Sequence, residues 1–66
     1  MGHIGTKERF HLKDGRIITC RNEYITYCTV SIYVDGEVIF YYELKKVEYL
    51  NDYNVVIKTI IPKYPN

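Results

Sequence analysis

Residues 30–42 read VSIYVDGEVIFYY, and in this stretch an Asp-Gly pair separates two runs of β-branched and aromatic residues. Asp-Gly between such runs is the strongest short-range sign of a β-hairpin, because glycine readily adopts the left-handed conformation that the turn needs. The stretch therefore predicts a β-hairpin with Gly36 at a positive φ.

The register of this hairpin is inferred from the alignment that gathers the apolar side chains on one face. A two-residue loop at Asp35-Gly36 would place Ser31 opposite Phe40 and would mix polar and apolar residues on both faces. A three-residue loop over residues 34–36, with Gly36 in a bulge, gives one apolar face instead. This register predicts a buried set that consists of Cys28, Val30, Ile32, Val38, Phe40 and Tyr42.

A second Asp-Gly pair lies nearer the N-terminus, at Asp14-Gly15, between the runs of residues 9–12 and 16–20. We expect the same three-residue loop geometry here, with Gly15 at a positive φ. This geometry predicts one shared face for Phe10, Leu12, Ile18 and Cys20.

In chain order, the hairpin around Asp14-Gly15 is the first hairpin and that of residues 30–42 is the second. After the second hairpin, Leu44 and Val47 do not follow the two-residue period of the preceding strand. We interpret Lys45-Lys46 as a bulge or a single helical turn that bends the chain. A short helix over residues 43–50 is the alternative, because the apolar residues there are also three positions apart. Strands are then expected at 47–50 and 55–61, with a turn over 51–54 between them.

The composition favours an all-β fold. Val, Ile, Thr, Tyr and Phe supply 30 of the 66 residues, while Ala, Gln and Trp are absent. Residues that suit a pleated surface therefore outnumber strong helix formers. We expect about five or six antiparallel strands in sequence order, curled into a small barrel of SH3-like or Sm-like shape or into a strongly bent sheet, because closure removes exposed edges.

A chain of this length forms one domain. We expect residues 1–66 to form a single small β domain, with a flexible N-terminus over residues 1–6 and an extended tail over residues 62–66. Pro62 and Pro65 end the last strand, because proline cannot donate a hydrogen bond to a sheet ladder.

The charge is nearly balanced, with a formal net charge of +1. Residues 1–22 carry five basic and two acidic side chains, a net +3, whereas residues 23–66 carry four and six, a net −2. No stretch is long and apolar enough to span a membrane, and no signal peptide is visible. We therefore expect the protein in the cytoplasm, or in that of a host cell.

Two further features of the sequence bear on its origin and processing. The first six residues, MGHIGT, match the pattern for N-myristoylation at Gly2, and a frayed N-terminus is the alternative. The absence of Ala, together with frequent Ile, Lys, Tyr and Asn, fits an A·T-rich genome such as that of a bacteriophage or its host. We therefore expect the chain to be an accessory protein of a phage or prophage.

No sequence motif indicates catalysis, and so small a chain can scarcely enclose a water-excluding pocket. Cys20 and Cys28 are expected to be buried and reduced, with a disulfide between them as the alternative if their strands are neighbours. A zinc site that adds His3 and His11 to these cysteines lacks the usual ligand spacing. We therefore expect no metal, no cofactor and no catalytic residues.

The register inferred for the second hairpin exposes a tyrosine-rich face. Rigid amphipathic tyrosine rings are favoured at protein interfaces, so this face predicts protein–protein contacts, either self-assembly into a homo-oligomer or capture and inhibition of a partner protein. The alternative is that barrel closure buries several of these rings as a second core. The predicted binding residues are Tyr27, Tyr33, Ile39 and Tyr41.

The second functional hypothesis is a small barrel that binds single-stranded nucleic acid. In that case tyrosines would stack on bases while the basic first hairpin follows the phosphates. The tyrosine-rich strands carry Glu37 and Glu43, however, and the net charge is almost zero, so protein binding is favoured. The residues assigned to nucleic-acid contact are Arg9, Lys13, Arg16 and Arg21.

Overall fold

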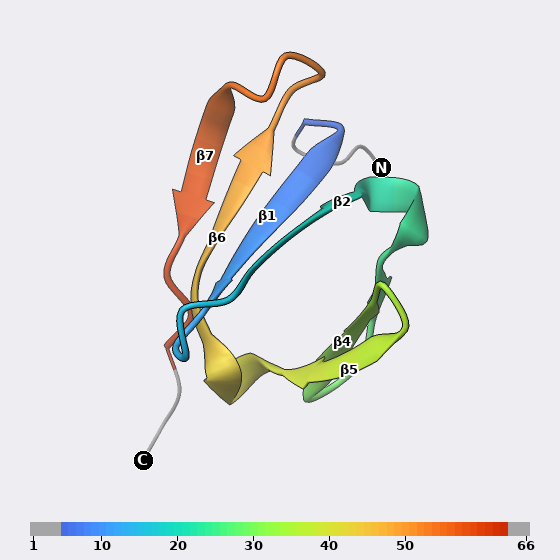
Figure 1. The fold of residues 1–66 in the computed structure, drawn as a ribbon, viewed down its shortest axis with the longest axis vertical. Helices are drawn as coiled ribbons and strands as arrows, with labels where there is room; N and C mark the ends of the chain where they lie inside the picture. Colours follow the sequence, from blue (N-terminus) through green and yellow to red (C-terminus); the bar gives the residue numbers. More distant parts are fainter. Residues whose placement is uncertain (1–4, 64–66) are drawn as a thin grey trace.

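The computed structural model describes residues 5–63, which form seven β-strands in two antiparallel sheets (Figure 1). The first sheet has the order β2-β1-β6-β7 and contains β1 (Lys7–Leu12), β2 (Ile17–Arg21), β6 (Leu44–Leu50) and β7 (Val56–Ile60). The second has the order β3-β4-β5 and contains β3 (Thr26–Tyr27), β4 (Ser31–Val34) and β5 (Glu37–Phe40). The sheets are connected by two short 3-10 helices, η1 (Asn22–Tyr24) and η2 (Tyr41–Glu43).

The predicted all-β class is confirmed, but the order of the strands is not the predicted one. β1 lies between β2 and β6, so strands far apart in sequence are paired (Figure 1). The reason is that η1 leads the chain away to the second sheet and η2 leads it back to the first. The strands of residues 5–63 pair as two separate sheets, and closure into a barrel is not confirmed.

The first hairpin has the predicted register. Phe10 pairs with Ile18, and the N–H of Leu12 donates to the carbonyl of Arg16 at 2.9 Å, so the loop spans residues 13–15. Gly15 has a φ of 98°, as the loop geometry requires. The inward side chains are buried or half-buried: Phe10, Leu12, Ile18 and Cys20.

The second hairpin has a different register from the predicted one. Ile32 pairs with Ile39, so the loop consists of Asp35 and Gly36 alone. These residues have φ values of 53° and 75°, which identify a type I′ turn. The positive φ of Gly36 is confirmed, and the three-residue loop is wrong.

Relative to the prediction, this register keeps the faces of β4 and exchanges those of β5. Ile32, Val34 and Ile39 are buried, with Ile39 only 2% exposed. The expectation of burial fails for residues 38 and 40 because the two-residue turn shifts the register of β5. It fails for residues 28, 30 and 42 because they lie outside the strands, which cover only residues 31–34 and 37–40. The residues expected in the core but found exposed are Cys28, Val30, Val38, Phe40 and Tyr42.

The bend before the last two strands is a β-bulge. His11 pairs with Lys46 and Leu12 with Leu44, so Lys45 is an extra residue opposite β1. The extra residue allows Leu44 and Val47 to point into the core although they are three positions apart. The bulge is therefore confirmed, and the alternative helix over residues 43–50 is wrong.

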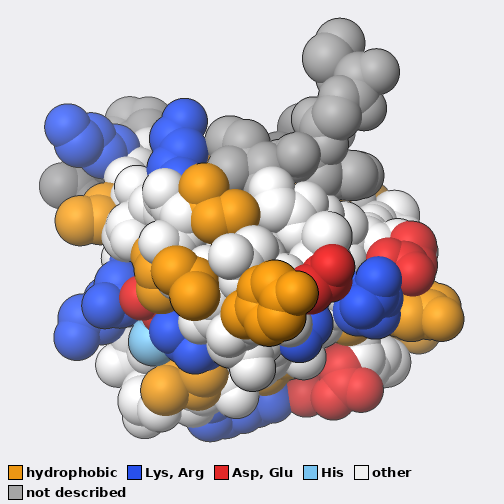
Figure 2. Space-filling view, turned by 90° about the horizontal axis from the view of Figure 1, so that it is seen from above, with side chains coloured by type: hydrophobic (Ala, Val, Ile, Leu, Met, Phe, Trp, Pro, Cys, Tyr) orange, Lys and Arg blue, Asp and Glu red, His pale blue; other side chains and the backbone are white. Residues whose placement is uncertain are grey.

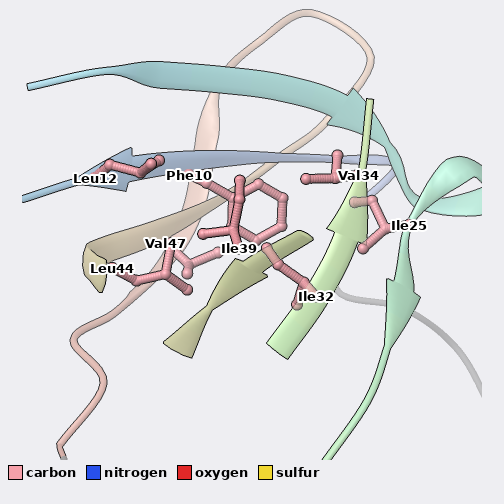
Figure 3. Close-up of a cluster of buried hydrophobic side chains, with 8 residues drawn as sticks. All are labelled: Phe10, Leu12, Ile25, Ile32, Val34, Ile39, Leu44 and Val47. Carbon is pink, nitrogen blue, oxygen red and sulfur yellow. The ribbon is translucent and has the colours of Figure 1, made fainter. Parts of the chain in front are cut away.

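The core lies between the two sheets, and both sheets contribute to it (Figure 3). Each fully buried large aliphatic or aromatic side chain contributes about 1.5–3 kcal/mol of transfer free energy, so this cluster holds the sheets together. Its members are Phe10, Leu12, Ile25, Ile32, Val34, Ile39, Leu44 and Val47.

The strand at one end of the first sheet has no such cover. β7 pairs with β6 after a turn closed by a hydrogen bond from the N–H of Asn54 to the carbonyl of Asn51 at 3.0 Å. Figure 1 shows it as the outermost strand, on the side away from the second sheet. As a result, all five of its residues are exposed.

Several expectations concern residues 1–4 and 64–66, which lie outside the described residues. They include the modification of Gly2, the placement of His3 and part of both expected terminal segments. Within residues 5–63, no helix is long and apolar enough to cross a membrane.

Candidate protein-binding surface

The outward side of the β4–β5 hairpin carries a group of large apolar side chains that water reaches. Because side chains alternate along a strand, the register that buries Ile32, Val34 and Ile39 turns their neighbours outward. We call this surface the outer hairpin face. It consists of Tyr33, Val38, Phe40 and Tyr42, with exposed fractions of 50%, 56%, 39% and 61%.

The side chains of the outer hairpin face lie next to one another. Tyr33 is directly opposite Val38 across the β4–β5 ladder. The rings of Phe40 and Tyr42 are stacked, with centroids 5.5 Å apart and planes 10° from parallel. Directly opposite residues in an antiparallel pair are close enough for their side chains to touch. The hydrogen-bonded hairpin therefore presents these four residues as one surface.

A shallow hollow adjoins this face at Tyr42. Its volume is about 260 Å³, and it is lined by Leu12, Lys13, Asp14, Tyr42 and Glu43. Pockets for small molecules usually occupy about 300–1,000 Å³. The hollow is below that range, and its size suits a single side chain of a partner better than a cofactor.

An ion pair fixes the end of the hairpin to the first sheet. The Arg16 guanidinium donates to both carboxylate oxygens of Glu37, at 2.8 Å and 2.6 Å. The hydrogen bond and the charge of Glu37 raise the pKa of Arg16. Both side chains are exposed, so the pair contributes little to stability. Its effect is to place charged groups at the rim of the outer hairpin face.

The structure does not bring the four predicted binding residues together. Tyr33 lies on the outer hairpin face, but Ile39 belongs to the core. Tyr27 is exposed, as predicted, but its hydroxyl is turned towards β1, where it donates a hydrogen bond to the Glu8 carboxylate. Tyr41 lies in η2, and its hydroxyl donates to the carbonyl of Cys28 at 2.6 Å.

The partial burial of the two tyrosine side chains affects their ionisation. Burial raises the pKa of Tyr27, and its hydrogen bond to Glu8 raises it further. Burial likewise raises the pKa of Tyr41. Both phenols therefore stay protonated near neutral pH and act as hydrogen-bond donors within the fold.

Val38, Phe40 and Tyr42 are not among the surface residues predicted from the sequence, which places all three in the core. A signal for the first two is nevertheless present, because Asp-Gly is the preferred pair for a two-residue type I′ turn. With that turn at Asp35-Gly36, the strand alternation puts Val38 and Phe40 outward. The stacking of Tyr42 on Phe40 depends on η2 and has no comparable sequence signal.

The basic residues assigned to nucleic-acid contact do not form one free surface. Arg9 donates to Glu48 at 2.7 Å, and Arg21 donates to Glu23 at 3.2 Å. Arg16 is engaged by Glu37, as described above. Lys13 lies in the loop of the first hairpin, where its N–H donates to a backbone carbonyl at 2.9 Å.

On the outward side of the first sheet, a single carboxylate holds two basic partners. Glu48 accepts hydrogen bonds from Arg9 and from His11. These two contacts lower the pKa of Glu48 from its ordinary 4.5 to about 2. Glu48 is therefore ionised at neutral pH and neutralises part of the positive charge on this side of the sheet.

Both cysteines are free thiols, but only one is partly covered. Cys20 packs against the core, and burial raises the pKa of its thiol. Cys28 is exposed, contrary to the expectation of burial. Among residues 5–63, no group of three or more His, Cys, Asp and Glu side chains is arranged to hold a metal ion.

A second group of exposed apolar side chains lies on and beside β7 and consists of Val55, Val56, Ile57, Ile60 and Ile61. In Figure 2, which views the molecule from above, hydrophobic side chains are interleaved with Lys, Arg and acidic side chains. Single exposed hydrophobic residues are normal on soluble proteins, whereas contiguous groups indicate contact surfaces. The outer hairpin face is a contiguous group by this criterion.

Comparisons of the chain with protein-family models, with curated proteins and with solved structures found no significant match.

Proposed function

We propose that this chain is a small, non-catalytic binding module that acts through protein–protein contacts made by the outer hairpin face. The observation that carries the proposal is the adjacency of Tyr33, Val38, Phe40 and Tyr42 on one exposed sheet face. Aromatic residues clustered at the centre of a surface, with polar residues around them, are the usual source of binding energy at interfaces.

Two features of the face support a protein partner. Its scaffold is a hydrogen-bonded hairpin anchored by buried Ile32, Val34 and Ile39, so little conformational entropy is lost when a partner binds. The hollow beside Tyr42, of about 260 Å³, has room for a side chain of a partner. A partner that inserts an apolar residue there would also cover the stacked rings of Phe40 and Tyr42.

The nucleic-acid hypothesis has less support. Binding to single strands combines aromatic stacking with a free basic groove. Here Arg9, Arg16 and Arg21 are each engaged by a carboxylate. The aromatic residues of the outer hairpin face have Glu37 and Glu43 beside them, and these acids would repel phosphates. We also propose an origin in a phage or prophage, from the composition, and a place in the cytoplasm or in that of a host cell.

Site-specific photo-crosslinking in the cells that naturally make the protein tests the proposal. A photoreactive phenylalanine derivative replaces Tyr33 or Tyr42 in one set of variants and Ile17 in a matched control, since Ile17 is also exposed but lies in β2. We expect positions 33 and 42 to capture the same protein, or a second copy of the chain, and position 17 to capture neither. Equal capture at all three positions, or capture of nucleic acid alone, would overturn the proposal.

A further inference from the structure

The last strand of the first sheet exposes apolar side chains on both of its faces. β7 forms one end of the order β2-β1-β6-β7, so one of its edges has no neighbouring strand among the described residues. Val56, Ile57 and Ile60 are 40%, 52% and 37% exposed, and the adjoining Val55 and Ile61 are exposed as well. This strand is therefore open along its edge and apolar above and below.

An open edge of this kind is a template for another strand. Each edge strand presents a row of unpaired N–H and C=O groups, and proteins usually protect it with charges, proline or bulges. β7 carries one charge, Lys58, and one irregularity of the ladder at Ile57, and proline follows at Pro62, so residues 58–60 remain a regular segment. β2 at the opposite edge also carries one charge, Arg21, but it exposes only residues 17, 19 and 21, whereas β7 exposes all five of its residues. β7 is therefore the edge strand that leaves more apolar surface open to a further strand.

We propose that β7 pairs antiparallel with β7 of a second copy of this chain, so that two four-stranded sheets become one continuous sheet across a two-fold axis. A two-fold axis requires the same surface on both copies, and an antiparallel strand can pair with itself in this way. Strand addition satisfies the free backbone groups, and it brings the apolar side chains of the two strands into lateral contact on both faces.

The register of this pairing follows from charge and regularity. An axis at Lys58 would place two ammonium groups opposite each other, which is unfavourable. An axis at Thr59 places Lys58 opposite Ile60 and Ile57 opposite Ile61. The regular β6–β7 pairing runs through residues 58–60, since the ladder shifts between Tyr49 and Leu50. The axis therefore lies at Thr59, in the middle of the regular segment.

A second copy fits this edge better than a charged partner. The chain has a net charge of +1, so two copies repel each other only weakly. In the Thr59 register no like charges are directly opposed, and the side chains that meet are mainly apolar. The outer hairpin face belongs to the other sheet and stays exposed, so the dimer would offer two copies of it.

The mass of the protein in solution, measured by sedimentation at several concentrations, tests the pairing. We expect a dimer of the 7.9 kDa chain. Thr59→Lys and Thr59→Asp each place like charges across the axis, so each variant alone should be monomeric, and an equimolar mixture should form dimers again. The matched control is Thr19→Lys, an exposed threonine of β2, which should leave the dimer intact.

The results that would overturn the proposal are equally definite. They are a monomeric wild-type protein, dimers in both Thr59 variants, or a mixture that stays monomeric. If a charged variant fails to fold, Thr59→Cys in a Cys28→Ser background decides instead. Mild oxidation should then link two chains through residue 59, and a faster link through Lys58→Cys would overturn the Thr59 register.

Discussion

The hydroxyl of Tyr27 on β3 donates a hydrogen bond to the carboxylate of Glu8 on β1, and this contact joins the two sheets inside the molecule. Glu8 is only 1% exposed. A buried carboxylate is costly unless donors compensate for its lost hydration. The tyrosine that the sequence analysis assigns to a binding face therefore has a structural role in the fold.

Tyr27→Phe is expected to lower the free energy of unfolding by about 1–3 kcal/mol, because the buried carboxylate loses one donor. Urea unfolding at neutral pH measures the change. Tyr33→Phe is the matched control, since Tyr33 points outward, and it should change stability little. Equal unfolding free energies for the two variants would show that the hydroxyl of Tyr27 contributes nothing.

The register of the second hairpin is tested by two neighbouring residues. Ile39→Ala should destabilise the fold by about 2–4 kcal/mol, since Ile39 lies in the core. Val38→Ala should lower the free energy of unfolding by less than about 1 kcal/mol, because Val38 is on the outer hairpin face. Thermal melts of both variants show which register is correct. A larger loss of stability for Val38→Ala than for Ile39→Ala would support the three-residue loop.

The type I′ turn predicts a specific cost at Gly36. A Cβ on Gly36 would meet no atom within 4 Å, so any loss of stability comes from its φ of 75° and not from a clash. Gly36→Ala is expected to lower stability by about 1 kcal/mol, while Asp35→Asn should be nearly neutral, because Asn also tolerates positive φ. Chemical denaturation measures both, and an unchanged Gly36→Ala would contradict the turn assignment.

Acid should weaken the protein partly through Glu48. Its pKa is about 2 in the fold and 4.5 ordinarily, because Arg9 and His11 bind the ionised form. A lowered pKa gives stability that is fully present above pH 4.5 and is lost as the pH falls from 4.5 towards 2. Melting temperatures across this range should fall less steeply for Glu48→Gln than for the wild type, and parallel curves would refute the assignment.

The features that the sequence predicts correctly are local ones. The Asp14-Gly15 loop, the bulge at Lys45 and the turn over residues 51–54 each follow from neighbouring residues and from one alternating pattern. The predicted register of the second hairpin is wrong because it maximises the apolar residues on one face, whereas the turn preference of Asp35-Gly36 fixes the register. Local turn chemistry therefore has priority over face counting in such short strands.

The features that the sequence misses depend on contacts between distant segments. The pairing of β1 with β6 joins residues about 40 positions apart, and no pattern in either strand specifies it. The predicted binding residues follow from the wrong register, so only Tyr33 of the four lies on the outer hairpin face. The position of Tyr42 depends on η2, which also returns the chain to the first sheet.

The affinity of the crosslinked partner for purified variants tests the central claim most directly. Calorimetric titration compares two variants. One is a double variant that carries both Tyr33→Ser and Val38→Ser, and the other is the matched control Ile17→Ser. All three substituted positions are exposed. We predict that the double variant binds at least roughly thirtyfold more weakly, since residues at the centre of an interface contribute about 1 kcal/mol or more each, and that it melts like the wild type. Unchanged affinity in a folded double variant would contradict the assignment of the outer hairpin face as the binding surface.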